Sequence, residues 1–173
     1  MQKHNLLFLI GFLCAALSGC AGRLARLPEA ESEPAVTTIP ALIATDRASG
    51  VALQALAHLG APYRVAGLSP QTGFDCSGFV AYAYREGAGL ELPSNTFDLS
   101  RVGEPVERTA LRPGDLVFYN TQRREYSHVG IYLGEDRFIH APSSGGEVRV
   151  ESLRANYWLR RYNGARRVIT PPL

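Results

Sequence analysis

The chain has 173 residues, of which 46% are hydrophobic and 20% are charged, and its formal net charge is +2. This length allows one domain with a substantial core plus additional segments. The nearly balanced charge argues against a nucleic-acid-binding protein, which would carry a strongly basic surface.

Residues 1–19 have the pattern of a signal peptide. A short basic start precedes an apolar run from Leu6 to Leu17, which is too short for a comfortable permanent membrane span. The run ends in Leu-Ser-Gly and then Cys20, which resembles the lipobox of bacterial lipoproteins, where the chain is cut before the cysteine and the cysteine receives lipid. We therefore expect a palmitate-bearing lipoprotein anchored to the membrane at Cys20. An ordinary secretory signal is the alternative.

The segment after Cys20 predicts where the folded part is held. Ala21, rather than Asp, favours the outer membrane of a Gram-negative bacterium by resemblance to its lipoproteins, with the protein facing the periplasm. Residues 20–45 contain prolines and glutamates without a clear period, which is typical of a linker. We expect the folded domain to occupy residues 46–173.

Counting the cysteines leaves one thiol. Cys14 would leave with the signal peptide and Cys20 would carry lipid, so Cys76 is the only free cysteine and no intramolecular disulfide is possible. Asp75 is a favourable N-cap before the apolar run that follows, which predicts a buried helix with Cys76 in its first turn. The helix N-terminus would favour a nucleophilic thiolate. The alternative is that Cys76 is a small core side chain.

The order of the other elements predicts an α+β fold. A helix should begin near Asp46 or Ser49 and stop at Gly60, and a short helix is possible near 96–101 within an otherwise irregular stretch. Short strands follow, joined by short connections, which predicts a central antiparallel sheet of about five strands with the N-terminal helices packed on it. The predicted strands are 115–119, 128–133, 137–141, 148–150 and 166–169.

Two histidines on neighbouring predicted strands are candidates for the base that a thiol nucleophile requires. If Gly134-Glu135-Asp136 forms the loop between the strands, His128 and His140 share one face of the sheet. His128 would be the general base, and His140 would fix its tautomer. Two structural histidines are one alternative, and a metal site formed with Cys76 is a weaker one, because the local spacing typical of zinc ligands is absent. We predict no metal and no cofactor.

Tyr63 and His58 are two further residues for which the sequence predicts a role or a location. The backbone N–H of Cys76 and the hydroxyl of Tyr63 could hold an oxyanion, although most tyrosines are packing residues. His58 is predicted to be a partly exposed surface histidine rather than a ligand.

Four motifs in this order resemble the NlpC family of papain-like cysteine peptidases of the bacterial cell wall. The resemblance covers residues 46–170, and the C-terminal stretch 157–168 is most similar to the Spr (MepS) branch of lipoprotein murein endopeptidases. The motifs are Gly73-Phe74-Asp75-Cys76-Ser77-Gly78-Phe79-Val80, Leu111-Arg112-Pro113-Gly114-Asp115-Leu116-Val117, His128-Val129-Gly130-Ile131-Tyr132-Leu133-Gly134 and Phe138-Ile139-His140-Ala141.

The resemblance implies a papain-like fold in which Cys76 is the nucleophile, His128 the base and His140 the orienting third residue. It also implies that Tyr63 lies in the active site. Asp75 and Ser77, which flank the cysteine, would help to shape the substrate groove. The implied substrates are the peptide stems of peptidoglycan, which the enzyme would meet as a monomer held by its lipid anchor.

The sequence departs from the family at two positions. A Gly-Gly pair that often follows the tyrosine is Ala66-Gly67 here, and Ser94 stands where arginine is frequent. These departures leave bond preference open, between the D-Ala–diaminopimelate cross-link and the D-Glu–diaminopimelate bond of a stem. The rival functions are a catalytically silent peptidoglycan-binding lipoprotein and an amidase or acyltransferase of the same fold. The intact set of Cys76, His128 and His140 argues against the silent protein.

Overall fold

The computed structural model describes residues 38–144 and 146–170. The predicted signal peptide, the lipidation site at Cys20 and most of the predicted linker lie outside these residues. Among the helices of the described part, none combines the length and apolar character that a membrane crossing requires.

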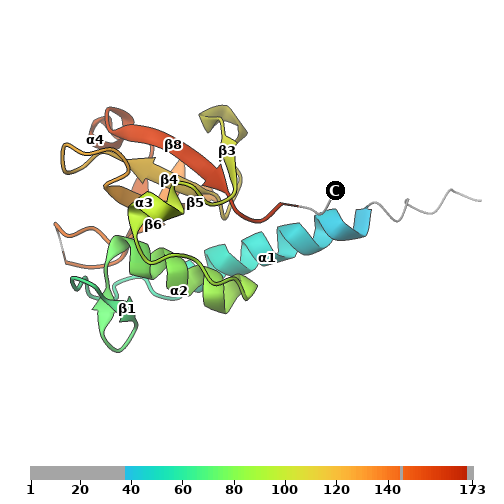
Figure 1. The fold of residues 1–173 in the computed structure, drawn as a ribbon, viewed down its shortest axis with the longest axis horizontal. Coiled ribbons are helices and arrows are strands. Elements are labelled where there is room, and N and C mark those ends of the chain that lie inside the picture. The colour runs from blue at the N-terminus through green and yellow to red at the C-terminus, as the bar shows by residue number, and fades with distance from the viewer. Residues whose placement is uncertain (1–37, 145, 171–173) are drawn as a thin grey trace, which may run out of the picture. The chain divides into compact units, whose positions relative to one another are not determined.

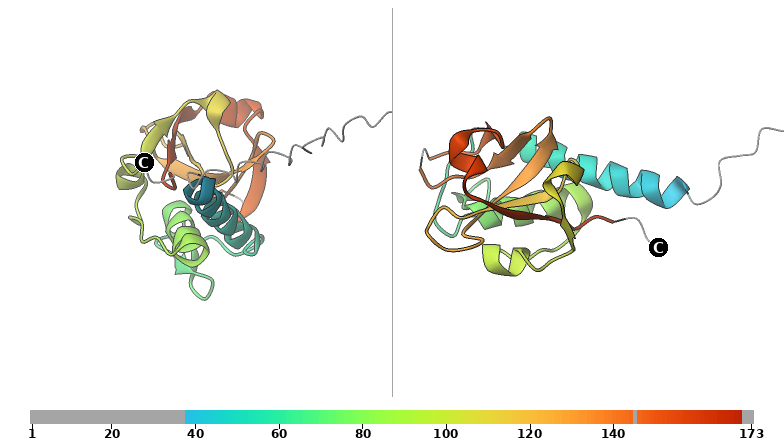
Figure 2. Two further views of the ribbon diagram at one scale, coloured as in Figure 1. Left: turned by 90° about the vertical axis from the view of Figure 1, so that its right-hand side faces the viewer. Right: turned by 90° about the horizontal axis from the view of Figure 1, so that it is seen from above.

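Two long helices and one six-stranded antiparallel sheet form most of the described domain (Figure 1). Helices α1 (Thr38–Leu56) and α2 (Cys76–Ala88) lie side by side, and the two further views show the sheet beside them (Figure 2). The strand order is β3-β8-β4-β5-β6-β7. The strands are β3 (Glu104–Val106), β4 (Leu116–Tyr119), β5 (His128–Gly134), β6 (Arg137–His140), β7 (Arg149–Ser152) and β8 (Tyr162–Arg167).

Short elements connect these parts. A two-stranded pair precedes α2, a short helix follows it, and single turns flank β4 and β8. They are β1 (Leu68–Ser69), β2 (Gly73–Phe74), α3 (Thr96–Leu99), the 3-10 turn η1 (Arg108–Ala110) and α4 (Asn156–Leu159).

The two long helices touch at a pair of glycines. A Cβ atom on Gly50 would lie 2.3 Å from the carbonyl oxygen of Gly87, and one on Gly87 would lie 2.6 Å from that of Gly50. Only residues without side chains allow this approach, so the contact fixes how closely the C-terminal end of α2 lies against α1.

Both faces of the sheet are buried. On one face Phe118, Val129 and Ile131 pack against apolar side chains of α1 and α2, among them Phe79 and Tyr84. On the other face a smaller cluster is fully or nearly fully buried beneath α4. Its members are Val117, Tyr119, Tyr132, Phe138, Leu153, Trp158 and Ala165. Side chains that alternate along β5 and β6 therefore enter two different environments.

The predicted fold class is confirmed, with differences in detail that include the last strand, which covers residues 162–167 rather than 166–169. The sheet has six strands rather than about five, because β3 pairs with β8 in a stretch expected to be irregular. Residues 68–69 and 73–74 form a β-pair within the expected loop region. Helix α1 begins at Thr38, before the expected start at Asp46 or Ser49, and ends at Leu56. Its third residue is a proline, which is tolerated there because the first backbone N–H groups of a helix have no intrahelical partner.

The turn between β5 and β6 differs from the predicted three-residue loop, although His128 and His140 still share one face of the sheet. Gly134 pairs with Arg137, so the loop contains only Glu135 and Asp136, both with positive φ angles near 55° (52° and 55°). A bulge between Tyr132 and Gly134 inserts the compensating residue. Without it, a two-residue loop would have reversed the relative faces of the two strands.

Candidate active site

Asp75 is the N-cap of α2 and therefore positions Cys76, the first residue of the helix. Its backbone is extended, with φ −91° and ψ 177°, and its Oδ1 accepts a 2.7 Å hydrogen bond from the N–H of Gly78. The Ser77 hydroxyl lies 3.0 Å from the same oxygen and 2.8 Å from the carbonyl oxygen of Ser94. The predicted N-cap is confirmed, and Ser77 ties the helix start to the segment that contains the family departure at position 94.

Gly78 allows a close approach to this helix start, and the approaching group is the chain itself. A Cβ atom on Gly78 would lie 2.1 Å from the carbonyl oxygen of Gly67 and 2.9 Å from a methyl carbon of Leu68. Gly67 is equally constrained, because its Cβ would lie 2.3 Å from the carbonyl oxygen of Gly73. The preceding Ala66 adopts a φ of 56°, which an L-residue adopts only with strain.

Cys76 is partly buried and carries the one free thiol of the described residues. Burial, together with the Asp75 carboxylate, raises the pKa of this thiol to about 11, although backbone amides of Val129, Ser77 and Cys76 itself lower it. The expected thiolate is therefore not the resting form, because desolvation outweighs the helix N-terminus. The Val129 amide places the thiol against β5, at the residue that follows His128 in the chain.

His128 and His140 lie on one face of the sheet, and their rings are joined by a hydrogen bond. Nε2 of His128 is 2.7 Å from Nδ1 of His140, and the two residues are 6% and 0% exposed. Burial lowers the pKa of both to about 3, assisted by His140 in the case of His128 and by Arg149 in the case of His140. Both imidazoles are therefore neutral at pH 7, as a general base must be.

Gly130 makes room for this pair. A Cβ atom on Gly130 would lie 2.7 Å from a ring carbon of Phe138, 2.8 Å from the carbonyl oxygen of Ile139 and 3.2 Å from Cβ of His140. The glycine of the His128 motif is thus needed for close packing of β5 against β6 beside the site.

Tyr63 lies close enough to the helix start for electrostatic coupling. Its pKa is raised first by burial and then by Cys76 and Asp75, so its hydroxyl keeps its proton and can donate a hydrogen bond. Its backbone N–H donates to the carbonyl oxygen of Gly146 at 2.6 Å, which fixes the loop. Its role toward an oxyanion stays a prediction.

His58 lies apart from Cys76 and the histidine pair, and the described residues provide no metal-ligand group. His58 follows α1 and packs against Phe74 and Tyr82, with ring centroids 5.6 and 5.0 Å away. Among residues 38–144 and 146–170, no group of three or more histidine, cysteine, aspartate or glutamate residues is arranged to hold a metal ion.

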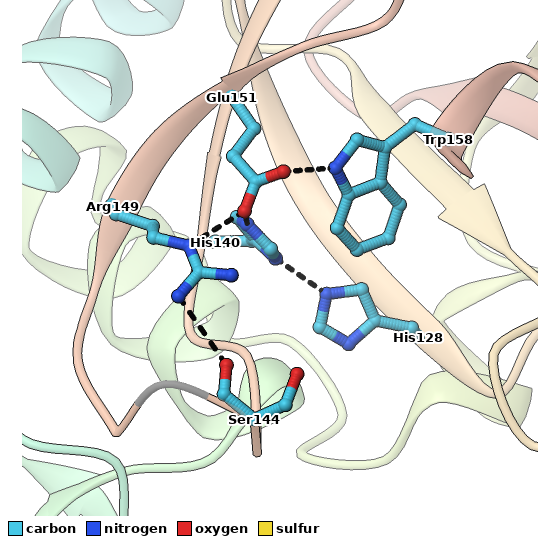
Figure 3. Close-up of polar contacts among 6 residues, drawn as sticks. All are labelled: His128, His140, Ser144, Arg149, Glu151 and Trp158. Atoms are coloured by element: carbon cyan, nitrogen blue, oxygen red, sulfur yellow. Dashed lines mark hydrogen bonds and ion pairs between the residues drawn. The ribbon is translucent and has the colours of Figure 1, made fainter. Parts of the chain in front are cut away.

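The sequence reasoning missed three residues that surround the histidines (Figure 3). Glu151 accepts hydrogen bonds from Arg149 and from the indole N–H of Trp158, and its Oε1 lies 3.5 Å from Nε2 of His140. Trp158 stacks on His128. The available signals were weak: Arg149 lies in the predicted strand 148–150, Glu151 follows it directly, and Trp158 is the only tryptophan of the sequence.

Comparison with known proteins places this chain in a family. The NlpC/P60 family model matches residues 60–167. The chain is 45% identical to Murein DD-endopeptidase MepH of Escherichia coli over 129 residues, covering 72% of this chain and 48% of MepH. It is also 45% identical to Murein DD-endopeptidase MepS/Murein LD-carboxypeptidase of the same species, covering 64% of this chain and 57% of the relative. The chain thus spans about half the length of these relatives.

Similarity to another relative and to solved structures extends the comparison. The chain is 36% identical to the Probable endopeptidase NlpC of Escherichia coli, covering 88% of this chain and 92% of the relative. The crystal structure of an NlpC/P60 family protein from Bacillus cereus aligns with a TM-score of 0.66 at 33% identity, covering 71% of this chain and 40% of the other.

The peptidoglycan hydrolase RipB from Mycobacterium tuberculosis aligns with a TM-score of 0.65 at 30% identity, covering 80% of this chain and 73% of the other. The resemblance found in the sequence motifs is confirmed. The chain belongs to the NlpC/P60 family of cysteine peptidases.

Proposed function

We propose that this protein is a lipid-anchored cysteine peptidase that hydrolyses peptide bonds in peptidoglycan. The observation that carries the proposal is the 2.7 Å hydrogen bond between His128 and His140, which involves the strand whose Val129 amide faces the Cys76 thiol. Cys76, His128 and His140 can supply the nucleophile, the base and the orienting residue that a thiol peptidase needs.

The reaction begins from neutral partners. His128 takes the proton of the Cys76 thiol as the sulfur attacks the carbonyl carbon of a peptide stem, so the thiolate forms only as it is used. The histidine then gives this proton to the leaving amine, and an acyl-thioester remains on Cys76. Water, deprotonated by His128, cleaves the thioester and releases the carboxylate product and the thiol.

The developing oxyanion requires donors at the helix start. The backbone N–H of Cys76 and the hydroxyl of Tyr63 are proposed to supply them. Asp75 and Ser77 act by holding the start of α2 and its contact with Ser94, on the groove side implied by the family resemblance.

The choice of bond follows the relatives. MepH and MepS are both named murein DD-endopeptidases, and the name of MepS adds murein LD-carboxypeptidase, so we propose cleavage of cross-links as the main reaction. Lipid on Cys20 and a linker after it would restrict the enzyme to wall near the outer membrane, on the periplasmic side.

The test is digestion of purified peptidoglycan by the mature chain, residues 20–173 with Cys20→Ser, and by the same chain carrying Cys76→Ala. Mass spectrometry of the products is expected to show cross-linked muropeptides converted to monomers by the first protein only. Shortened stems would instead identify the bond within the stem, and transfer products would identify an acyltransferase.

One outcome would overturn the proposed activity, and a separate experiment tests the anchor. Binding to the wall without any Cys76-dependent product would favour the catalytically silent protein. The anchor is tested separately: labelled palmitate should enter the full chain expressed in a Gram-negative host and should not enter its Cys20→Ser variant.

A further inference from the structure

Glu151 occupies a position from which it can act on both histidines. It lies on β7, opposite Phe138 of β6, while Arg149 of the same strand lies opposite His140. Its side chain is only 24% exposed. Figure 3 shows its carboxylate between His140, Arg149 and Trp158.

Each carboxylate oxygen has its own partners. Oε1 accepts a 2.6 Å hydrogen bond from Nε of Arg149 and faces Nε2 of His140 at 3.5 Å. Oε2 accepts from the indole N–H of Trp158. Nε2 of His140 is buried and forms no standard hydrogen bond with any described residue, so this carboxylate oxygen is its electrostatic counterpart.

The bond between the two neutral histidines allows two proton arrangements. In the first, His140 carries its proton on Nε2 and accepts through Nδ1, so His128 donates from Nε2 and keeps Nδ1 free. In the second, both protons move to the Nδ1 atoms. His128 then has no free nitrogen that could accept the proton of the Cys76 thiol. Only the first arrangement leaves His128 able to act as a base.

The charge of Glu151 discriminates between these arrangements. The first directs an N–H of His140 at Oε1, whereas the second directs a lone pair at it. Because the nitrogen is fully buried, this difference is weakly screened by water. Burial, and then the charge of Arg149, which is paired with the same carboxylate, lowers the pKa of His140, so the imidazole stays neutral.

Glu151 also reaches the base by a second route. Trp158, whose N–H it accepts, lies almost parallel to the ring of His128, with centroids 5.6 Å apart and 23° between the planes. Holding the indole therefore limits rotation of the His128 ring away from His140.

We propose that Glu151 is a positioning residue that selects the Nε2–H tautomer of His140 and, through Trp158, fixes the orientation of His128. This inference rests on the proposed function for its catalytic consequence, but its tautomer claim concerns the histidines alone.

The test compares Glu151→Gln with a matched control, Glu135→Gln, in the mature chain carrying Cys20→Ser. Glu135 is also ion-paired, to Arg137 at 2.7 Å, but is exposed in the β5–β6 turn. The ring nitrogens are followed by ¹⁵N NMR at neutral pH. The mature chain has only three histidines, so His58 is an internal reference.

In the wild type and in Glu135→Gln, the ¹⁵N shifts should report His140 protonated on Nε2 and His128 protonated on Nε2. In Glu151→Gln, the two nitrogens of His140 should move toward each other as the second tautomer becomes populated, with His58 unchanged. The kcat for cross-linked muropeptide should fall about tenfold or more with little change in KM.

Unchanged shifts of His128 and His140 in Glu151→Gln would overturn the proposal, even if activity fell, because a merely structural role would remain. An Nδ1–H tautomer of His140 in the wild type would overturn it as well. If the wild-type protein had no peptidase activity, the proposed function would fail while the tautomer result would still decide the role of Glu151.

Discussion

The indole ring of Trp158 lies against the imidazole of His128 in a nearly parallel stack and meets His140 edge-on, with centroids 4.9 Å apart and 87° between the planes. One side chain therefore contacts both members of the histidine pair. Trp158 is 5% exposed and belongs to the core cluster on the side of the sheet away from α1 and α2. The histidine pair is consequently supported by that cluster, while the thiol is carried by the helix on the other side of the sheet.

Replacing Trp158 by phenylalanine should lower kcat more than it changes KM. The substitution keeps an aromatic face against His128 but removes the N–H that Glu151 accepts. We expect a decrease of roughly tenfold, equivalent to about 1.4 kcal/mol in the activation barrier. Tyr157→Phe, at the exposed neighbouring position, is the control and should behave as wild type. A change confined to KM would contradict this account.

The reactivity of Cys76 should increase with pH well beyond the range of an ordinary thiol. Because its pKa is raised to about 11, the rate of alkylation by iodoacetamide should keep rising through pH 9 to about 10 rather than level off near 8.5. Asp75→Asn removes a charge that raises this pKa but keeps a good N-cap, so it should speed alkylation at pH 8 without lowering Tm. Equal rates in both proteins, measured by mass spectrometry, would exclude the proposed effect of Asp75.

Acidification should destabilise the domain through its buried histidines. The pKa values of His128 and His140 are lowered to about 3, from 6.5 in the unfolded chain, so between these values the unfolded state binds more protons. The free energy of unfolding should therefore fall as pH decreases below about 6.5, by up to about 1.4 kcal/mol per pH unit for each histidine. The nearby Glu151 and Arg149 have opposing effects on His128.

Urea unfolding at several pH values measures this slope, and His140→Gln should reduce it because one titrating group is removed. His58→Gln serves as the control, since that residue lies outside the buried pair. Identical slopes in wild type and His140→Gln would show that the acid sensitivity has another source.

Substituting Gly130 by alanine should impair the site more than the fold around it. The added methyl group would meet the ring of Phe138, the backbone at Ile139 and Cβ of His140, so β6 must move away from β5. We expect destabilisation of about 1–3 kcal/mol and loss of most activity in the folded fraction.

Gly87→Ala provides the comparison, because its methyl group would clash with Gly50 at the contact of the two helices instead of beside the histidines. It should lower Tm while leaving the activity of the folded fraction closer to wild type. A Gly130→Ala protein with normal kcat would show that the spacing of β5 and β6 is not critical for the base.

The local motifs were sufficient to predict the main parts of the site. Asp75 followed by an apolar run predicted the helix start at Cys76, because capping and periodicity are properties of adjacent residues. The shared face of His128 and His140 was also predicted correctly, although through a three-residue loop that the structure replaces with a two-residue turn and a bulge. Strand β3 was missed because three residues containing Pro105 show no alternation and gain their order by pairing with β8.

The sequence by itself determined the family and the fold class, and it predicted the candidate nucleophile and the histidine pair, because each depends on short motifs in a fixed order. The tertiary structure decided the protonation state of Cys76, since burial by distant elements outweighs the local effect of the helix N-terminus. It also brought Glu151 and Trp158 to the histidines by pairing β7 with β6 and by placing α4 over the sheet. Such contacts join residues far apart in the chain, so no local sequence pattern predicts them.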